Sequence, residues 1–169
     1  MTLKRICLYG PESVGKTTLA RQLAAHYQTV FVPEVARDLI TSNDLTPADY
    51  ERIGHAQTEA IRRATPAAHR VLICDTDVIT TILYAETYLG QAPPVLFELA
   101  KEVTFDRYFL LDIDVPWVAD GLRDLGHRRQ ELYDRFRRAL DERGIAWVPV
   151  CGTWDERLRT VTGEIDALL

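Results

Sequence analysis

Near its N-terminus the chain reads Gly10-Pro11-Glu12-Ser13-Val14-Gly15-Lys16-Thr17. The spacing is Gly, four residues, Gly, Lys and then Ser or Thr, which is the pattern of a phosphate-binding loop. Glycine lets the backbone turn tightly and approach a ligand without a Cβ atom in the way. The loop amides and the start of the following helix can then point at phosphate oxygens. We expect Lys16 to hold the terminal phosphates and the Thr17 hydroxyl to bind Mg²⁺.

The flanking sequence favours this interpretation over a chance glycine-rich turn. Residues 3–9 form a short run with an apolar end, as expected for a strand, and Leu19, Leu23 and Tyr27 then recur at helical spacing. Strand, loop and helix in this order are the context that the motif requires, so the sequence predicts binding of a nucleoside triphosphate. The nucleotide contacts that we predict along the loop are Gly10, Glu12, Ser13, Val14, Gly15, Lys16, Thr17 and Thr18.

Composition narrows the class of protein. A length of 169 residues suits one domain, here residues 1–169, with a sizeable buried core. A net charge of −5 argues against a broad basic surface for nucleic acid. The chain contains neither an apolar run long enough to cross a bilayer nor a signal-peptide pattern, so we expect no membrane partner. Its three cysteines lack metal-site spacing, which is typical of reduced thiols in a cytoplasmic protein.

Apolar runs alternate with helical patterns along the whole chain. The runs that we expect to be strands are residues 3–9, 29–32, 71–75, 108–112 and 145–150. This alternation predicts an α/β fold with a parallel sheet covered on both faces. Ligands of such sheets bind beyond the carboxyl ends of the strands. The loop and three acids, Glu34, Asp75 and Asp112, all lie at such ends, so we expect them to meet in one cleft.

A phosphate loop needs a partner carboxylate to complete the surroundings of Mg²⁺. Two buried runs end in an acid, at Asp75 and at Asp112. We favour Asp75 as the metal ligand beside Thr17, because Asp77 stands next to it and a pair of acids suits both a metal and a substrate hydroxyl. The alternative for Asp77 is a purely structural role as the N-cap of the following helix.

Two further residues suit the acceptor side of a phosphoryl-transfer site. Glu34 and Arg37 lie three apart where a short helix is expected to begin, so both can face the cleft. A carboxylate there could accept a hydroxyl proton while the arginine steadies an anionic oxygen. The alternative is a solvated ion pair. Gln57 and Tyr84 are weaker candidates for lining the acceptor pocket.

Residues 115–129 read as a lid segment. They are polar, contain two glycines and lack a clear period, and three arginines crowd them without evident acidic partners. This composition is typical of a lid that brings positive charge to a transferring phosphoryl group. Arg123 and Arg128 are the best placed of the three for catalysis and nucleotide binding; the alternative is a solvated helix face. Trp117 in the same segment is either a packing anchor or an aromatic surface for the acceptor.

With these residues in view, the chain resembles the nicotinamide riboside kinase domain of the NadR family. The resemblance rests on segments 10–18, 33–37, 74–77, 110–117 and 120–124. It implies a P-loop kinase fold of the nucleoside and thymidylate kinase type, with a five-stranded parallel sheet and a mobile lid. It also implies ATP and Mg²⁺, and phosphorylation of the 5′-hydroxyl of nicotinamide riboside to the mononucleotide. It leaves room for a homodimer.

The chain also departs from full-length NadR proteins. These often carry a nucleotidyltransferase domain with a His-x-Gly-His motif, and some carry a DNA-binding domain; neither pattern is present, so adenylyl transfer and repression are not implied. One alternative is a kinase for another nucleoside or for a nucleoside monophosphate, which would call for more arginine than Arg37. Another is a non-enzymatic nucleotide-dependent switch or binding module, although the guanine-specific Asn-Lys-x-Asp pattern is missing.

Nicotinamide riboside carries a cationic pyridinium ring, so its pocket should offer aromatic faces and carboxylates. Trp117 would supply such a face, and Asp112, Asp114 and Asp120 crowd the same edge of the predicted sheet. A cation over a tryptophan face gains roughly 0.5 to 2 kcal/mol. We therefore expect these four residues to favour nicotinamide riboside over uncharged nucleosides.

Overall fold

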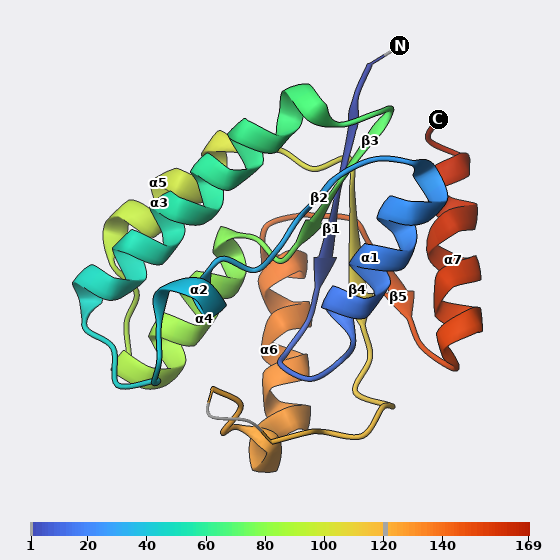
Figure 1. Cartoon of the computed structure of the whole chain (residues 1–169). Coiled ribbons are helices and arrows are strands. Elements are labelled where there is room, and N and C mark those ends of the chain that lie inside the picture. The colour runs from blue at the N-terminus through green and yellow to red at the C-terminus, as the bar shows by residue number, and fades with distance from the viewer. Residues whose placement is uncertain (1, 120–121) are drawn as a thin grey trace.

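The computed structural model describes residues 2–119 and 122–169. Five strands form one parallel sheet in the order β2-β3-β1-β4-β5, which confirms the predicted α/β architecture (Figure 1). The strands are β1 Lys4–Tyr9, β2 Phe31–Val32, β3 Val71–Asp75, β4 Arg107–Leu111 and β5 Trp147–Val150. Because all five run in the same direction, their carboxyl ends meet at one edge of the sheet, the lower edge in Figure 1.

Helices cover both faces of this sheet. Two of them, α1 and α7, lie on one face, and α3 to α6 lie on the other (Figure 1). The helices are α1 Lys16–Tyr27, α2 Ala36–Leu39, α3 Pro47–Ala64, α4 Val78–Leu89, α5 Pro94–Glu102, α6 Arg129–Glu142 and α7 Trp154–Asp166. Two short 3₁₀ helices, η1 Thr65–Ala67 and η2 Gly126–Arg128, precede β3 and α6.

The central strand β1 shows why the strands read as apolar runs. Ile6 and Leu8 pack into the core beneath α1 and α7, whereas Cys7 and Tyr9 pack into the core on the opposite face. A strand buried on both faces has no polar side, so its sequence does not alternate. Residues that follow such a strand are the first that can meet a ligand.

Capping residues fix where the helices begin. The Thr46 hydroxyl accepts a hydrogen bond from the Asp49 amide, and the Asp49 carboxylate accepts one from the Thr46 amide. Thr153 and Glu156 form the same reciprocal pair at the start of α7. Each capping box satisfies two backbone donors that the helix leaves unpaired, which fixes the start of α3 and of α7.

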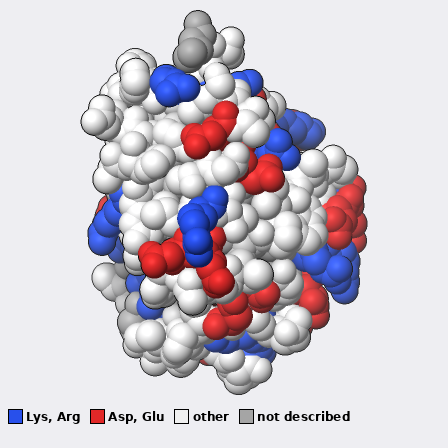
Figure 2. Space-filling model, turned by 90° about the vertical axis from the view of Figure 1, so that its right-hand side faces the viewer, with Lys and Arg blue, Asp and Glu red and all other residues white. Residues whose placement is uncertain are grey.

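The surface carries charges of both signs. Figure 2 shows the side of the molecule on which α7 lies, and there acidic and basic side chains are interspersed. Within residues 2–119 and 122–169, every helix is too short or too polar to cross a bilayer.

Candidate active site

The phosphate loop connects β1 to α1, and its two glycines are required by their surroundings. Gly15 is the N-cap of α1 with φ of 89°, in the left-handed region, and a Cβ atom there would lie 2.4 Å from the Trp154 ring. Gly10 has φ of 146°, and a Cβ atom would lie 3.0 Å from the Leu111 carbonyl oxygen. Since larger residues would be strained at both positions, the loop keeps its backbone close to its neighbours and its amides free of side-chain cover.

Lys16 extends back into this loop. Its Nζ atom donates hydrogen bonds to the carbonyl oxygens of Gly10 at 2.9 Å and Pro11 at 2.8 Å. The side chain is only 8% exposed. The ammonium is thus held inside the loop, where it can neutralise a bound phosphate.

Thr17 and Asp75 form the part of the site that fits a magnesium ion. The Thr17 hydroxyl donates to Asp75 Oδ2 at 2.6 Å, while Oδ1 is buried and has no hydrogen-bond partner among the described residues. Burial raises the pKa of Asp75, and the nearby charge of Lys16 opposes that rise. The described residues contain no group of three or more acids, histidines or cysteines that could hold a metal by themselves. Magnesium commonly needs only one or two protein ligands when phosphate and water complete its octahedron, so this pair fits it.

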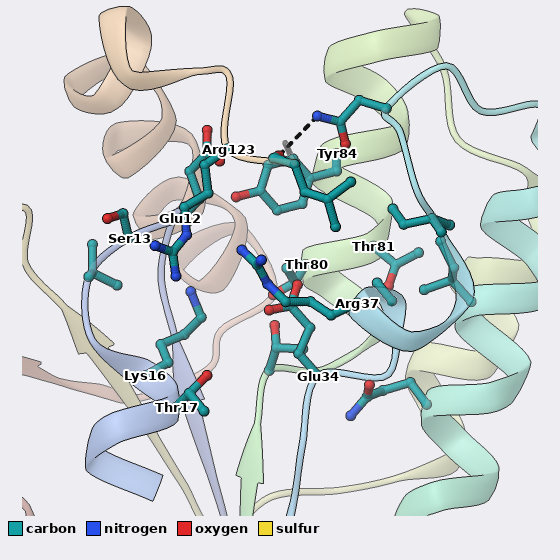
Figure 3. Close-up of a pocket in the computed structure, with 18 of the residues that line it drawn as sticks. Glu12, Ser13, Lys16, Thr17, Glu34, Arg37, Thr80, Thr81, Tyr84 and Arg123 are labelled. Carbon is teal, nitrogen blue, oxygen red and sulfur yellow. Dashed lines mark hydrogen bonds between the residues drawn. The ribbon is translucent and has the colours of Figure 1, made fainter. Parts of the chain in front are cut away.

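A pocket opens beside the loop at the carboxyl edge of the sheet. Figure 3 shows Lys16 and Thr17 on one side of it, with Glu34 and Arg37 on the other. Many of the residues predicted to form the site do line it. They are Glu12, Ser13, Val14, Gly15, Lys16, Thr17, Thr18, Glu34, Arg37, Gln57, Tyr84 and Arg123.

Glu34 is reached through the pocket but is surrounded by protein on its other sides. It follows β2 and precedes α2, so the expectation that Glu34 and Arg37 share the first turn of a helix was wrong for Glu34. Burial raises the pKa of the Glu34 carboxyl, and Lys16 opposes that rise. Gln57 Oε1 accepts a hydrogen bond from the Val35 amide at 3.1 Å and so holds this connection in place. A carboxylate with a raised pKa is a better proton acceptor than an ordinary glutamate.

Helices α3 and α4 supply much of the remaining pocket wall. Thr80, Tyr84 and Tyr88 line it from α4, at a spacing of four that places them on one face of the helix. Sequence reasoning missed several lining residues, and four of these carry hydroxyl groups: Tyr50, Thr76, Thr80 and Thr81. The four-residue spacing that leads back from Tyr84 was the pattern that could have identified Thr80 and Thr76.

Asp77 is placed outside this pocket. It is 3% exposed and is the N-cap of α4. Its Oδ1 atom accepts a hydrogen bond from the Thr80 amide at 3.1 Å, and its Oδ2 atom accepts one from the Tyr108 hydroxyl at 2.7 Å. The capping alternative therefore describes Asp77, and the substrate contact predicted for it is not what the structure shows.

The end of β4 also differs from expectation. Among the described residues, Asp112, Asp114 and Trp117 are absent from the pocket wall. Asp112 accepts from the adjacent Ile113 amide at 2.7 Å, and Asp114 is bonded to Arg157 and to the Gly152 amide. Asp114 is thus paired with the β5–α7 connection and α7, outside the pocket.

Trp117 is a packing residue. Its ring lies against Gly126, where a Cβ atom would come within 2.6 Å of it. The predicted aromatic and acidic surface for the acceptor is therefore not formed by Trp117, Asp112 and Asp114. Asp120, the fourth residue predicted for that surface, lies outside the described residues.

The lid segment lies against the phosphate loop, and one of its two predicted arginines lines the pocket. Arg123 lines the pocket. Arg128 is bonded to Glu131, an acidic partner one helical turn away, and is absent from the described pocket wall. Arg129 instead reaches the loop, donating to the carbonyl oxygens of Val115 at 2.7 Å and Ser13 at 3.4 Å. The choice of Arg128 over Arg129 was thus wrong about which side chain approaches the loop.

Two backbone amides of the lid segment donate to loop side chains. The Val118 amide donates to Ser13 Oγ at 2.9 Å, and the Leu125 amide donates to Glu12 Oε1 at 2.7 Å. Both bonds place the variable middle residues of the phosphate loop in contact with the lid segment.

Arg157 is a site residue that the sequence did not reveal. It is fully buried and donates to the carbonyl oxygens of Val14 and Gly152, each at 3.0 Å. Its guanidinium carbon lies 5.6 Å from the centroid of the Trp154 ring, whose edge covers Gly15. Arg157 thereby ties the phosphate loop to the connection between β5 and α7.

Comparison with known proteins shows the family to which the chain belongs. The family model described as "AAA domain" matches residues 5–157. The trifunctional NAD biosynthesis/regulator protein NadR of Escherichia coli is 34% identical over 156 residues, covering 88% of this chain and 38% of NadR. The Salmonella typhimurium NadR is 33% identical with the same coverage. The chain spans less than half the length of these relatives.

Solved structures give the same picture. A crystal structure of NadR in complex with NR matches with a TM-score of 0.79 and 26% identity, covering 98% of this chain and 48% of that chain. Thymidylate kinase from Ehrlichia chaffeensis matches with a TM-score of 0.70 at 16% identity, over 97% of this chain and 99% of that chain, which shows a shared fold alone. The resemblance to NadR that the motifs indicated is confirmed, and the match over residues 5–157 shows that the chain belongs to the AAA-domain family.

Proposed function

We propose that the protein is an ATP-dependent kinase that phosphorylates a nucleoside, with nicotinamide riboside as its preferred acceptor. The observation that carries this proposal is the pocket in which Lys16 of the phosphate loop faces Glu34 and Arg37 (Figure 3). One wall has the groups that bind a triphosphate, and the other has a base and a cation at the place where an acceptor must enter. The similarity to NadR over 88% of the chain supports the same assignment.

The proposed reaction uses these residues in distinct roles. The acceptor hydroxyl oxygen attacks the γ-phosphorus of ATP, the bond from that phosphorus to the β–γ bridging oxygen breaks, and ADP leaves with the bonding electrons. Glu34 accepts the hydroxyl proton. Lys16 and Arg123 place positive charge beside the phosphoryl oxygens. Thr17 and Asp75 would hold Mg²⁺, which neutralises charge on the β- and γ-phosphates when bound.

The acceptor side of the pocket suits a cationic ring. Three tyrosines, Tyr50, Tyr84 and Tyr88, line it together with Glu34. An aromatic face contributes roughly 0.5 to 2 kcal/mol to binding of a cation, and these tyrosines take the role first assigned to Trp117. Gln57 Nε2 is buried without a hydrogen-bond partner among the described residues, which leaves a donor for a substrate oxygen. The NadR crystallised with NR supports the same acceptor.

The test is incubation with Mg-ATP and, separately, nicotinamide riboside, uridine or thymidine monophosphate. ADP and the phosphorylated product are measured by liquid chromatography and mass spectrometry, with ATP alone as the control. We expect ADP to form with nicotinamide riboside together with its mononucleotide, and more slowly with uridine. Binding of Mg-ATP with no ADP from any acceptor would favour a binding module, and faster turnover of uridine or the monophosphate would contradict the proposed acceptor. A cytoplasmic location and a homodimer stay predictions.

A further inference from the structure

The turn between β3 and α4 holds Thr76 in an unfavourable backbone conformation. Its φ is +75°, in the left-handed region that β-branched residues strongly avoid. Three bonds keep it there: the Thr76 amide donates to the Leu8 carbonyl oxygen at 3.0 Å, Asp75 accepts from Thr17, and Asp77 caps α4. Strain of this kind persists where the surroundings over-determine the conformation, and it is concentrated at functional sites.

The buried hydroxyl of Thr76 is a second unfavourable feature of this residue, besides its backbone conformation. The residue is 4% exposed, and its Oγ1 atom is buried with no hydrogen-bond partner among the described residues. A buried hydroxyl loses its hydrogen bonds to water, so an unpaired one destabilises the fold. If position 76 had no ligand to bind, other residues would be more stable there. Valine would avoid the unpaired hydroxyl, and glycine would avoid both the hydroxyl and the backbone strain.

The position of Thr76 indicates what could pair with this hydroxyl. Thr76 lines the pocket, and Thr80, Tyr84 and Tyr88 follow it along the same wall at intervals of four residues. It stands at the end of this row nearest the phosphate loop, because the adjacent Asp75 contacts Thr17. The acceptor group that receives the phosphoryl must lie between that row and the loop.

We propose that Thr76 binds the acceptor, with Oγ1 donating a hydrogen bond to the hydroxyl oxygen that receives the phosphoryl group. While the acceptor hydroxyl gives its own proton to Glu34, a lone pair of the same oxygen can accept from Thr76. The bond orients the nucleophile, and it gives the Thr76 hydroxyl the partner that it lacks among the described residues. This inference rests on the proposed function, because it assumes a nucleoside in this pocket.

The test compares Thr76→Val, which keeps the branched shape, with Thr76→Ser, which keeps the hydroxyl. Calorimetric titration gives Kd for nicotinamide riboside without nucleotide and for Mg-ATP without acceptor, and thermal unfolding gives the ligand-free Tm. We expect valine to weaken nicotinamide riboside binding roughly two- to tenfold, the effect of one hydrogen bond, with Mg-ATP binding unchanged. The Tm of the valine variant should equal or exceed that of the unmutated protein, and serine should bind the nucleoside normally. Thr160→Val on α7, remote from the pocket, is the matched control.

A lower Tm in Thr76→Val together with equal losses for both ligands would show that the hydroxyl is structural and would overturn the inference. Unchanged nucleoside affinity would overturn it as well. If the unmutated protein phosphorylates uridine and not nicotinamide riboside, the proposed acceptor is wrong. The role of Thr76 is then tested by titrating both variants with uridine. Binding of no nucleoside at all would overturn both.

Discussion

The phosphate loop and the acceptor wall prepare for their ligands differently; the wall is formed by the β2–α2 connection, α3, the β3–α4 turn and α4. In the loop, Lys16 is bonded to Gly10 and Pro11 carbonyl oxygens, and Thr17 is bonded to Asp75. On the acceptor wall, Gln57 Nε2 and Thr76 Oγ1 are buried without hydrogen-bond partners among the described residues. The loop is thus held in shape by bonds of its lysine and threonine, whereas the wall keeps buried donors that an acceptor nucleoside can pair with. Changes in the loop should impair every acceptor, and changes in the wall should discriminate between acceptors.

The largest expected effect is on the acceptor side, at the proposed general base. Glu34→Gln keeps the shape of the side chain but cannot accept the hydroxyl proton, so kcat should fall by about 100- to 10,000-fold. Mg-ATP affinity should change little, because the triphosphate contacts are on the opposite wall. Steady-state kinetics and nucleotide titration measure the two effects. Glu51→Gln, exposed on α3, is the control, and a Glu34→Gln enzyme with normal kcat would remove Glu34 from the mechanism.

The pH dependence sharpens the same assignment. Burial raises the pKa of Glu34 above its ordinary value of 4.5. Only the ionised carboxylate can take a proton, so kcat should decline as the pH falls through this raised pKa and should be constant above it. The acid decline should disappear in the residual activity of Glu34→Gln. If the same decline persists in that variant, another group controls it.

The next largest effect is expected in the phosphate loop. Lys16→Ala removes the positive charge beside the transferring phosphoryl group, which should lower kcat by about 100- to 1,000-fold. The loss should be the same for every acceptor, because Lys16 contacts the donor. Thermal unfolding should change little, because the side chain points into the loop and not into the core. Lys4→Ala, at a surface ion pair with Asp106, is the matched control; an effect of Lys16→Ala on one nucleoside alone would contradict the division between loop and wall.

Local features of the molecule were predictable from the sequence. The phosphate loop spans eight consecutive residues, and the capping boxes at Thr46 and Thr153 span four each, so all their partners can be read together. The acceptor wall was predicted only in part, because it combines the β2–α2 connection, α3, the β3–α4 turn and α4. Thr76 looks ordinary in sequence, and its strain exists only because β1 and two neighbouring acids hold the turn.

Long-range partners explain the wrong assignments. Trp117 was predicted as an aromatic surface for the acceptor, but its ring packs against Gly126. Asp114 was predicted to face a cationic ligand, but its carboxylate forms an ion pair with Arg157, forty-three positions later. Arg128 and Arg129 are adjacent in sequence and point to different partners, a choice that depends on how η2 joins α6. The contacts of Trp117, Asp114 and Arg129 do not follow from spacing, whereas Glu131 lies three residues after Arg128, at helical spacing.

A smaller effect separates the two strand-end acids. Asp75 Oδ2 accepts from Thr17, and Oδ1 is left for a cation, so Asp75→Asn should lower Mg²⁺ affinity and kcat by about 10- to 100-fold. Asp112 bonds only to the next amide through its side chain among the contacts described, so Asp112→Asn should have little effect. Kinetics over a magnesium titration provide the measurement. A crippled Asp112→Asn beside a normal Asp75→Asn would show that the metal lies at the end of β4.

The smallest expected effect tests how the lid segment is joined to the loop. Arg129 donates to the carbonyl oxygens of Val115 and Ser13, and so holds residues of both segments together. Each hydrogen bond of this kind contributes about 0.5 to 1.5 kcal/mol, so Arg129→Ala should raise KM for Mg-ATP roughly two- to tenfold. KM for the acceptor should change less, because neither carbonyl is on the acceptor wall.

Arg128→Ala is the matched control, because it removes an arginine at the neighbouring position whose partner is Glu131. A surface ion pair between residues one helical turn apart contributes little free energy. The KM of Arg128→Ala for Mg-ATP should therefore stay close to that of the unmutated enzyme. Measuring both variants at high and low salt adds a second comparison. The Arg128 pair is exposed to screening, whereas the Arg129 bonds are partly buried and should respond less. A larger loss in Arg128→Ala than in Arg129→Ala would restore Arg128 as the arginine that approaches the nucleotide, and would mean that the lid segment rearranges when ATP binds.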